Sequence, residues 1–396
     1  MSRDDFLVKF SKDKGEPDWL LNYRKKALSE SSRLAFEPDS KFSKYNDRER
    51  YLTLSESELE IAYTKPEENR TSSIHSNASG ILVEEISSAL KNDKRLRDAV
   101  EHEVNYDSVG AAINSSFSSG LFIRVPDSYS AQVPLQISTS VFMGLNINKS
   151  AIIVGKNSHV KIVCELVSAD ASPSKFMQNL SVRIGQDSSL QLYSIQATNP
   201  YTIVSVWRDV YSEGKFGFVS LDSGGNSIRS RLKLDLEHGG AEGDVYEAFV
   251  GRSDMYFDVF NKIDHTKGNT ISRTNSRAIL DDSSKAVFKG SVHQEKEAIA
   301  SHTTLSEHSL LLSSGARSVS IPGLEIETNE VSASHSASSH TISKEDKFYL
   351  MSRGIEEKGA ANMIAVGFLD PVLSKFYSGL SDYYGNIEER LKNIVI

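Results

Sequence analysis

The sequence contains a single cysteine, Cys164, among its 396 residues. A disulfide within the chain therefore cannot form, and a metal site built from several cysteines is excluded. Val163 and Leu166 place Cys164 in an apolar, strand-like stretch. We interpret it as a buried packing residue, and a functional thiol is the alternative.

Long apolar runs are also missing. The longest, about residues 361–369, is far shorter than a membrane span, and the first residues have no apolar signal-peptide segment. The formal net charge of −8 disfavours a nucleic-acid partner. No Gly-x-x-x-x-Gly-Lys-Ser/Thr phosphate loop occurs. We therefore expect a cytoplasmic protein with neither a membrane nor a nucleic acid as its partner.

From about Gly110 the hydrophobic pattern has a period of two, which predicts strands. Clusters of Gly, Asn, Asp and Ser separate the apolar segments and predict turns. The expected strands are 121–125, 133–137, 151–154, 160–167, 180–184, 190–195, 216–221, 228–236, 245–250, 255–263, 271–279 and 286–292.

Two architectures fit so many short strands without helices, namely a sandwich or barrel and a parallel β-helix with coils of ~20 residues. Similar phrases of a polar turn followed by an alternating strand begin near residues 155, 185 and 281. This repetition favours the β-helix. We expect Leu310, Leu312, Leu324 and Ile326 among its inward-facing residues.

Both ends of the chain are predicted to be helical. The expected regions are an N-terminal helical region (1–109), a β-helix core (110–335) and a C-terminal helical domain (336–396). In the first, Asp18 is the expected N-cap of a helix, residues 38–58 a loop, and 81–90 and 95–104 further helices.

The C-terminal region has its own start and stop signals. Ser343 is the expected N-cap of a helix that stops at Gly354, and residues 355–369 form a second helix. Asp370-Pro371 is a typical start for a third. Ile387, Leu391 and Ile394 mark a last helix.

Several motifs carry a resemblance to a known family. They are Glu16-Pro-Asp-Trp-Leu-Leu, Leu310-Leu-Leu, Pro322-Gly-Leu-Glu-Ile, Ser334-His-Ser-Ala, Phe348-Tyr-Leu-Met-Ser-Arg-Gly-Ile and Gly367-Phe-Leu-Asp-Pro-Val-Leu. Together they resemble the SufB/SufD scaffold proteins of iron–sulfur cluster assembly. The resemblance spans most of the chain and implies a right-handed parallel β-helix between helical regions, in agreement with the pattern of strands.

The resemblance is closer to SufD than to SufB. SufB has a cysteine just before the Leu-Leu run and a glutamate just after its motif histidine, and the matching residues here are Glu307 and Ser336. The SufD-like motif C-S-H-G-A-T corresponds to Ala333-Ser-His-Ser-Ala-Ser. Its histidine is retained as His335, and Ala333 replaces its cysteine.

His335 is accordingly the candidate cluster-assembly residue and the candidate metal ligand, because a neutral imidazole is a common ligand of iron. A surface histidine in a serine-rich strand is the alternative. His340, five residues on, should face the opposite side of a strand. His302 and His308 could form a cluster with Glu307, although the spacing favours solvated side chains.

Two functions remain open. The first is a non-enzymatic SufD-like scaffold, which the resemblance implies would pair with a SufB-like subunit or with itself as a homodimer. It would share a transient iron–sulfur cluster with its partner and dock a SufC-like ATPase. The expected docking residues are Phe348, Tyr349, Arg353, Phe368, Leu373 and Phe376. The second is a β-helix carbohydrate-active enzyme with Asp281 and Asp282 as its carboxylates, a pair that we interpret as part of a turn.

Overall fold

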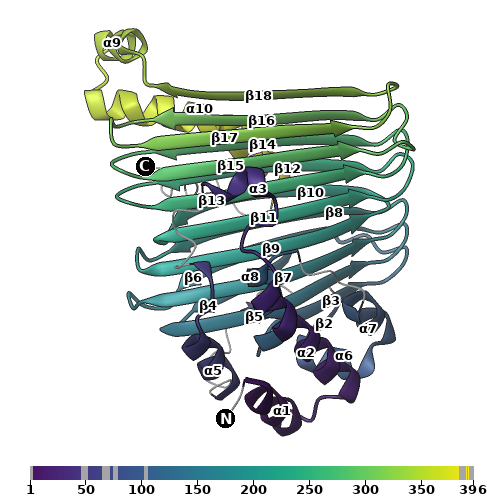
Figure 1. The fold of residues 1–396 in the computed structure, drawn as a ribbon. Coiled ribbons are helices and arrows are strands. Elements are labelled where there is room, and N and C mark those ends of the chain that lie inside the picture. Colours follow the sequence, from purple (N-terminus) through teal and green to yellow (C-terminus); the bar gives the residue numbers. More distant parts are fainter. Residues whose placement is uncertain are drawn as a thin grey trace.

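The computed structural model describes residues 3–45, 52–64, 72–74, 79–101, 106–382, 389 and 391. Its centre is a pair of nine-stranded sheets that face each other (Figure 1). From residue 121 onwards, successive strands alternate between the two sheets, and every strand pairs in parallel with the strand two positions later in the chain. This is a parallel β-helix, so the predicted fold class is confirmed.

The strands of the first sheet are β1 (Ser72–Ile74), β4 (Leu135–Val141), β6 (His159–Ser168), β8 (Ser189–Thr198), β10 (Lys215–Gly224), β12 (Glu242–Gly251), β14 (Ile271–Leu280), β16 (His302–Leu311) and β18 (Ser332–Thr341). Those of the second sheet are β2 (Leu82–Glu85), β3 (Leu121–Val125), β5 (Gly144–Val154), β7 (Ser174–Ile184), β9 (Thr202–Ser212), β11 (Ser227–Leu236), β13 (Tyr256–His265), β15 (Lys285–Gln294) and β17 (Arg317–Ile326). The short strands β1 and β2 pair antiparallel with β4 and β3.

Each coil is longer than expected. Lys215 pairs with Glu242, 27 residues on, and Ile271 pairs with His302, 31 residues on. The expected repeat of ~20 residues is wrong, because one coil contains two strands of about ten residues and two turns. The turns stack on one another: the Asn157 amide donates to the Gln186 carbonyl, and the Ser158 amide donates to the Ser188 hydroxyl.

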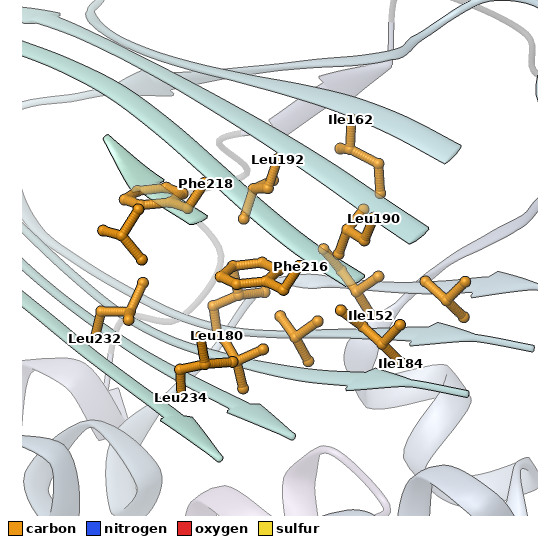
Figure 2. Close-up of a cluster of buried hydrophobic side chains, with 14 of the residues drawn as sticks. Ile152, Ile162, Leu180, Ile184, Leu190, Leu192, Phe216, Phe218, Leu232 and Leu234 are labelled. Carbon is orange, nitrogen blue, oxygen red and sulfur yellow. The ribbon is translucent and has the colours of Figure 1, made fainter. Parts of the chain in front are cut away.

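The interior contains two apolar clusters at opposite ends of the strands. One includes Leu190 and Phe216 from the first sheet with Leu232 and Leu234 from the second (Figure 2). The other is rich in phenylalanine, with Phe249, Phe257 and Phe288 in mutual contact. Polar side chains occupy the layer between the two clusters, and they are described below.

Of the four residues expected to face inward, only Leu324 packs against the interior cluster. Leu310 is buried, but it faces outward and packs against the C-terminal helix, while the next residue, Leu311, faces inward. Leu312 and Ile326 are exposed. The error at Leu310 is a shift of one residue, which reverses the face of a strand.

Seven helices are described in the N-terminal part: α1 (Arg3–Asp13), α2 (Asp18–Arg33), α3 (Ser40–Ser43), α5 (Glu56–Thr64), α6 (Ile86–Asn92), α7 (Lys94–Glu101) and α8 (Ser108–Ser116). Asp18 is the first residue of its helix, and Pro17 is the N-cap. The expected loop at 38–58 includes α3 and the start of α5. Helix α8 continues past Gly110, because its apolar residues pack with Phe122 and Ile147 of the first coils.

At the other end, β18 continues to Thr341, past the expected boundary at residue 335. Helix α9 (Lys344–Ser352) begins as predicted, with the Ser343 side chain accepting from the Asp346 amide. Among the described residues, no helix is both long enough and apolar enough to span a membrane.

The two helices predicted at residues 355–369 and from Asp370 onwards form one continuous helix, α10 (Glu357–Leu380), with Pro371 inside it. Pro371 cannot donate a backbone hydrogen bond. The carbonyl left without a helical donor is that of Gly367, four residues earlier. Burial of Leu369, Val372 and Phe376 against the first sheet favours a continuous helix, and Arg277 donates to the adjacent Phe368 carbonyl at 2.7 Å. Ile387 and Ile394 of the predicted last helix lie outside the described residues, and Leu391 is buried.

Candidate functional site

The candidate site lies at the C-terminal end of the β-helix. Strands β17 and β18 are the last strands of their sheets, so each pairs with a neighbour on one side only (Figure 1). The side chains of β18 are exposed except for Ala333, which is half-buried. The end therefore offers two strand edges with free backbone donors and acceptors, which is the usual template for pairing with another chain.

His335 is exposed and lies on this last strand. It is in register with Leu305 of β16, which faces the interior, so His335 lies above the end of the interior. His340 is in register with the outward-facing Leu310, and its ring contacts that of Phe368 edge-on at 5.6 Å. The prediction that the two histidines face opposite sides is confirmed.

Glu307 lies one strand below His335 and points into the interior, with 2% of its surface exposed. Burial, with a smaller contribution from nearby Glu247, raises the pKa of Glu307 to about 8, and a hydrogen bond with Ser320 opposes the shift. The carboxyl group is therefore mainly protonated at neutral pH. Glu307 is two residues from Leu305 and from Ser309, so all three face the same side of the strand. This spacing could have identified Glu307 as an interior residue from the sequence.

Glu247, Asp222 and Arg208 complete the polar layer of the interior, and the sequence reasoning missed all three. The Glu247 carboxylate accepts from Asn261 at 2.6 Å and from Ser276 at 2.8 Å, and burial raises its pKa. Burial also raises the pKa of Asp222 to about 6, although Arg208 opposes this shift. Arg208 donates to Ser230 at 3.0 Å.

The expected cluster of His302, His308 and Glu307 does not form. The two histidines lie on the outward face of β16, whereas Glu307 faces inward. His308 and the Ser338 hydroxyl form a hydrogen bond of 2.7 Å. Partial burial lowers the pKa of His308, and so do Arg277 and His340. Among the described residues, no group of three or more His, Cys, Asp or Glu residues is arranged to hold a metal ion. A metal at His335 would therefore need ligands from elsewhere.

Cys164 lines an internal cavity of about 80 Å³ near the other end of the β-helix, together with Arg208 and Asp222. Burial raises the pKa of the Cys164 thiol to about 12. The thiol is therefore protonated at neutral pH and is a poor nucleophile. Its contact with the apolar interior cluster supports the interpretation as a packing residue.

The expected docking residues divide into exposed and buried groups. Phe348 and Tyr349 of α9 are 73% and 57% exposed, and Arg353 is exposed with its guanidinium 5.2 Å from the Tyr349 ring. Phe368 is half-buried. Leu373 and Phe376 are fully buried between α10 and the first sheet, so the expectation that they dock a partner is wrong for this arrangement. Their apolar surface is used within the chain.

Asp281 and Asp282 lie in the turn between β14 and β15. The Asp282 carboxylate accepts from the Ser253 amide of the neighbouring turn at 2.8 Å, and Asp282 has a φ of 53°. The interpretation of this pair as turn residues is confirmed.

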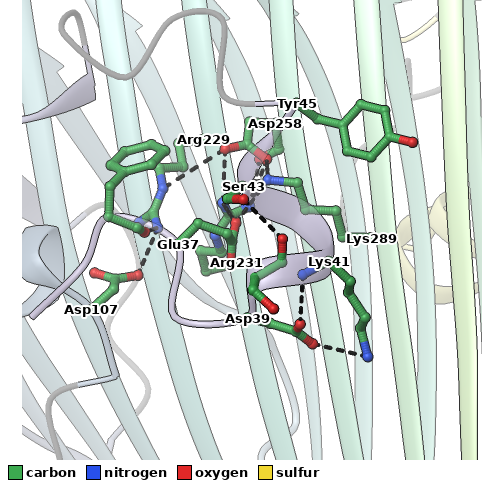
Figure 3. Close-up of polar contacts among 12 residues, drawn as sticks. Glu37, Asp39, Lys41, Ser43, Tyr45, Asp107, Arg229, Arg231, Asp258 and Lys289 are labelled. Atoms are coloured by element: carbon green, nitrogen blue, oxygen red, sulfur yellow. Dashed lines mark hydrogen bonds and ion pairs between the residues drawn. The ribbon is translucent and has the colours of Figure 1, made fainter.

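A buried cluster of charged residues on the outer face of the second sheet was not predicted (Figure 3). It contains three cations, Arg229, Arg231 and Lys289, and three carboxylates, Glu37, Asp107 and Asp258. Burial alone would raise the pKa of Asp258, but Arg231 and Lys289 hold it below its ordinary value. Because the charges balance, the cluster is better suited to fixing the N-terminal segment than to binding an ion.

Comparison with known proteins gives a consistent family. Residues 137–368 match the SUF system FeS cluster assembly, SufBD core domain. The chain is 27% identical to an iron–sulfur cluster assembly SufBD family protein of Staphylococcus saprophyticus, over 93% of this chain and 88% of the relative. A Staphylococcus epidermidis protein of the same description is also 27% identical, with the same coverage. One from Staphylococcus aureus is 30% identical over 74% of this chain and 64% of the relative.

The core-domain match spans more than half of the chain and falls on the β-helix, with its end in α10. The chain belongs to the SufBD family of iron–sulfur cluster assembly proteins.

Proposed function

We propose that this protein is a SufD-like, non-enzymatic scaffold subunit of a cytoplasmic iron–sulfur cluster assembly complex. The observation that carries the proposal is the open end of the β-helix in a chain of the SufBD family, where β17 and β18 each have an unpaired edge. A SufB-like subunit is the proposed partner at this end, with a second copy of the chain as the alternative. Alternating serine and alanine along β18 leave few large side chains to obstruct a partner strand.

His335 is the residue that we propose this subunit contributes to a transient cluster shared with the partner. It is exposed on the last strand, and its ring can reach a partner without any movement of the buried core. Ala333 stands where the SufD-like motif has a cysteine, so thiolate ligands would come from the partner. The cluster is cargo of the assembly rather than a permanent cofactor.

The proposed docking surface for a SufC-like ATPase is the exposed face of α9 and the start of α10. Phe348, Tyr349 and Arg353 form its centre, and Met351 and Met363 are 42% and 53% exposed. Exposed aromatic, methionine and arginine side chains are enriched at protein interfaces. Helix α9 has no buried residue, so it contributes little to the core of this chain.

Co-expression with a SufB-like subunit and a SufC-like ATPase tests the proposal, with complex size and bound iron as readouts. His335→Ala should leave assembly intact, because an exposed side chain contributes little packing, while lowering the amount of cluster formed. His340→Ala is the matched control and should lower it less.

Two results would contradict this assignment of His335. Wild-type rates of cluster formation in His335→Ala complexes would show that it is not a ligand. Loss of assembly in the same variant would instead make His335 an interface residue. Failure of the wild-type chain to associate with either partner would refute the scaffold function itself.

A further inference from the structure

Several buried oxygen atoms in the C-terminal half of the interior have no hydrogen-bond partner in the structure, and three of them lie in its polar layer. These three are Oε1 of Glu247, Oε2 of Glu307 and Oδ1 of Asn261, and the three residues are 0%, 2% and 4% exposed. Oε1 of Glu247 and Oδ1 of Asn261 are acceptors, and Oε2 of Glu307 is one when its carboxyl group is ionised. Buried acceptors without a donor are costly, and a group of them indicates that a donor or a cation belongs among them.

The three side chains enter the same layer of the interior from both sheets. Glu247, Ser276 and Glu307 are in register on β12, β14 and β16 and face the interior. Asn261 approaches from β13 of the other sheet and donates its amide to Glu247 at 2.6 Å. Gly290 is in register with Asn261, and a Cβ atom there would lie 2.8 Å from Oε1 of Glu307. Glu307 thus crosses the interior into space that Gly290 leaves open.

With all three of its carboxyl groups ionised, this layer would carry more negative than positive charge, and the nearby Glu247 is one reason why the pKa of Glu307 is raised. Asp222, Glu247 and Glu307 are buried carboxyl groups, and Arg208 is the one arginine or lysine that faces the interior within the described residues. Its guanidinium interacts with Asp222 and Glu247, at the end of the row away from Glu307. The end of the row at Glu307 therefore has carboxyl groups and no matching positive charge.

We propose that Glu247, Glu307 and Asn261 form a binding site for a hard divalent cation inside the last coils of the β-helix. Two carboxylates and an amide oxygen form an all-oxygen ligand set, which suits ions of the Mg²⁺, Mn²⁺ and Ca²⁺ class. This site is distinct from His335 and does not depend on the proposed scaffold function.

The proposed site lies close to the open end. Only the last coil separates Glu307 from solvent, and there Ala337 is in register with Glu307 and Pro322 with Gly290. Ala337 is exposed and Pro322 is half-buried. A partner that covers this end would enclose the bound ion, so occupancy and partner binding should influence each other.

Mn²⁺ is the probe for the test, because electron paramagnetic resonance counts the free ion directly. The full chain, freed of metals by chelation, should bind one Mn²⁺. Glu307→Gln and Glu247→Gln should each weaken that binding by more than about tenfold, and anomalous scattering from a Mn²⁺-soaked crystal should place the ion between these residues.

Glu325→Gln removes an exposed carboxylate from the same end of the β-helix and should leave Mn²⁺ binding unchanged, as should His335→Ala. The His335 control separates this site from the proposed cluster site. Absence of stoichiometric binding up to about 1 mM Mn²⁺ would overturn the proposal, since that is the weak limit for such sites. Unchanged affinity in a folded Glu307→Gln variant would overturn it as well.

Discussion

The buried charge cluster should make the N-terminal strap (residues 34–45) depend on Asp258. This carboxylate is fully buried, accepts from Arg231 at 2.7 and 2.9 Å, and lies 2.9 Å from Lys289. Asp258→Asn keeps the shape but removes the charge, leaving three buried cations against two carboxylates, Glu37 and Asp107. Removing one partner of a buried ion pair typically costs about 3–5 kcal/mol, so we expect a loss of that size in the free energy of unfolding.

Urea unfolding followed by circular dichroism measures this loss, and limited proteolysis of the strap gives a local readout. The strap is held through Glu37, which pairs with Lys289 at 2.8 Å, and through Tyr45, whose carbonyl accepts from Tyr256. Asp258→Asn should therefore also speed cleavage within the strap, because Arg231 and Lys289 lose their shared anion.

Two further variants distinguish the effect of burial from that of charge alone. Glu297→Gln breaks an exposed pair, since the side chains of Glu297 and Lys267 are 70% and 48% exposed. It should lower the free energy of unfolding far less than Asp258→Asn, because solvent screens exposed ion pairs. Combining Asp258→Asn with Lys289→Met restores equal numbers of charges and should recover part of the lost stability. If Asp258→Asn costs no more than Glu297→Gln, the cluster does not stabilise the fold in the way described.

The remaining predictions concern three other places in the chain. His265 is fully buried between Thr270 and Ser272, and burial lowers its pKa to about 4, so only the unfolded state binds a proton between pH 6.5 and 4. The free energy of unfolding should fall from pH 7 to pH 5 by about 2 kcal/mol more in the wild type than in His265→Gln. Urea unfolding at the two pH values that gives the same loss in both proteins would refute this. Cys164 should resist iodoacetamide at pH 8 until urea unfolds the chain, and mass spectrometry showing rapid native labelling would contradict its burial. Replacing Phe348 and Tyr349 with serine should weaken ATPase co-purification without shifting the unfolding midpoint, whereas unchanged co-purification would exclude α9 as the docking surface.

The architecture was predictable because each coil repeats the same local pattern. A polar turn followed by alternating apolar residues recurs often enough to favour a β-helix over a sandwich, and most strand positions follow from it. Strand β9 was missed because Arg208 and Asp209 interrupt its apolar alternation, although Arg208 faces the interior and bonds Ser230 there. The length of a coil was underestimated because weakly apolar strand ends were assigned to loops.

The site was predictable only where it depends on local alternation. The opposite faces of His335 and His340 follow from their spacing, and so does the inward position of Glu307. The charge cluster could not be read in this way, because Glu37 and Lys289 are 252 residues apart and meet only after the N-terminal strap has docked. Burial of Leu373 and Phe376 was likewise hidden, since an apolar helix face does not reveal whether its partner is another protein or this chain's own sheet.

The differences between the two ends of the β-helix suggest why function concentrates at the C-terminal end. At the N-terminal end the edges of β4 and β3 are paired with the short strands β1 and β2, and α2 and α8 cover the outer face of the second sheet, burying Leu20, Val109 and Ile113 there. The last coil has no such cover among the described residues: β18 carries exposed serines and histidines where earlier strands carry buried aliphatic residues. A fold selected for stability alone would cap this end, as repeat proteins usually do. The uncapped end instead leaves two strand edges and His335 open to a partner, with Glu307 one strand below.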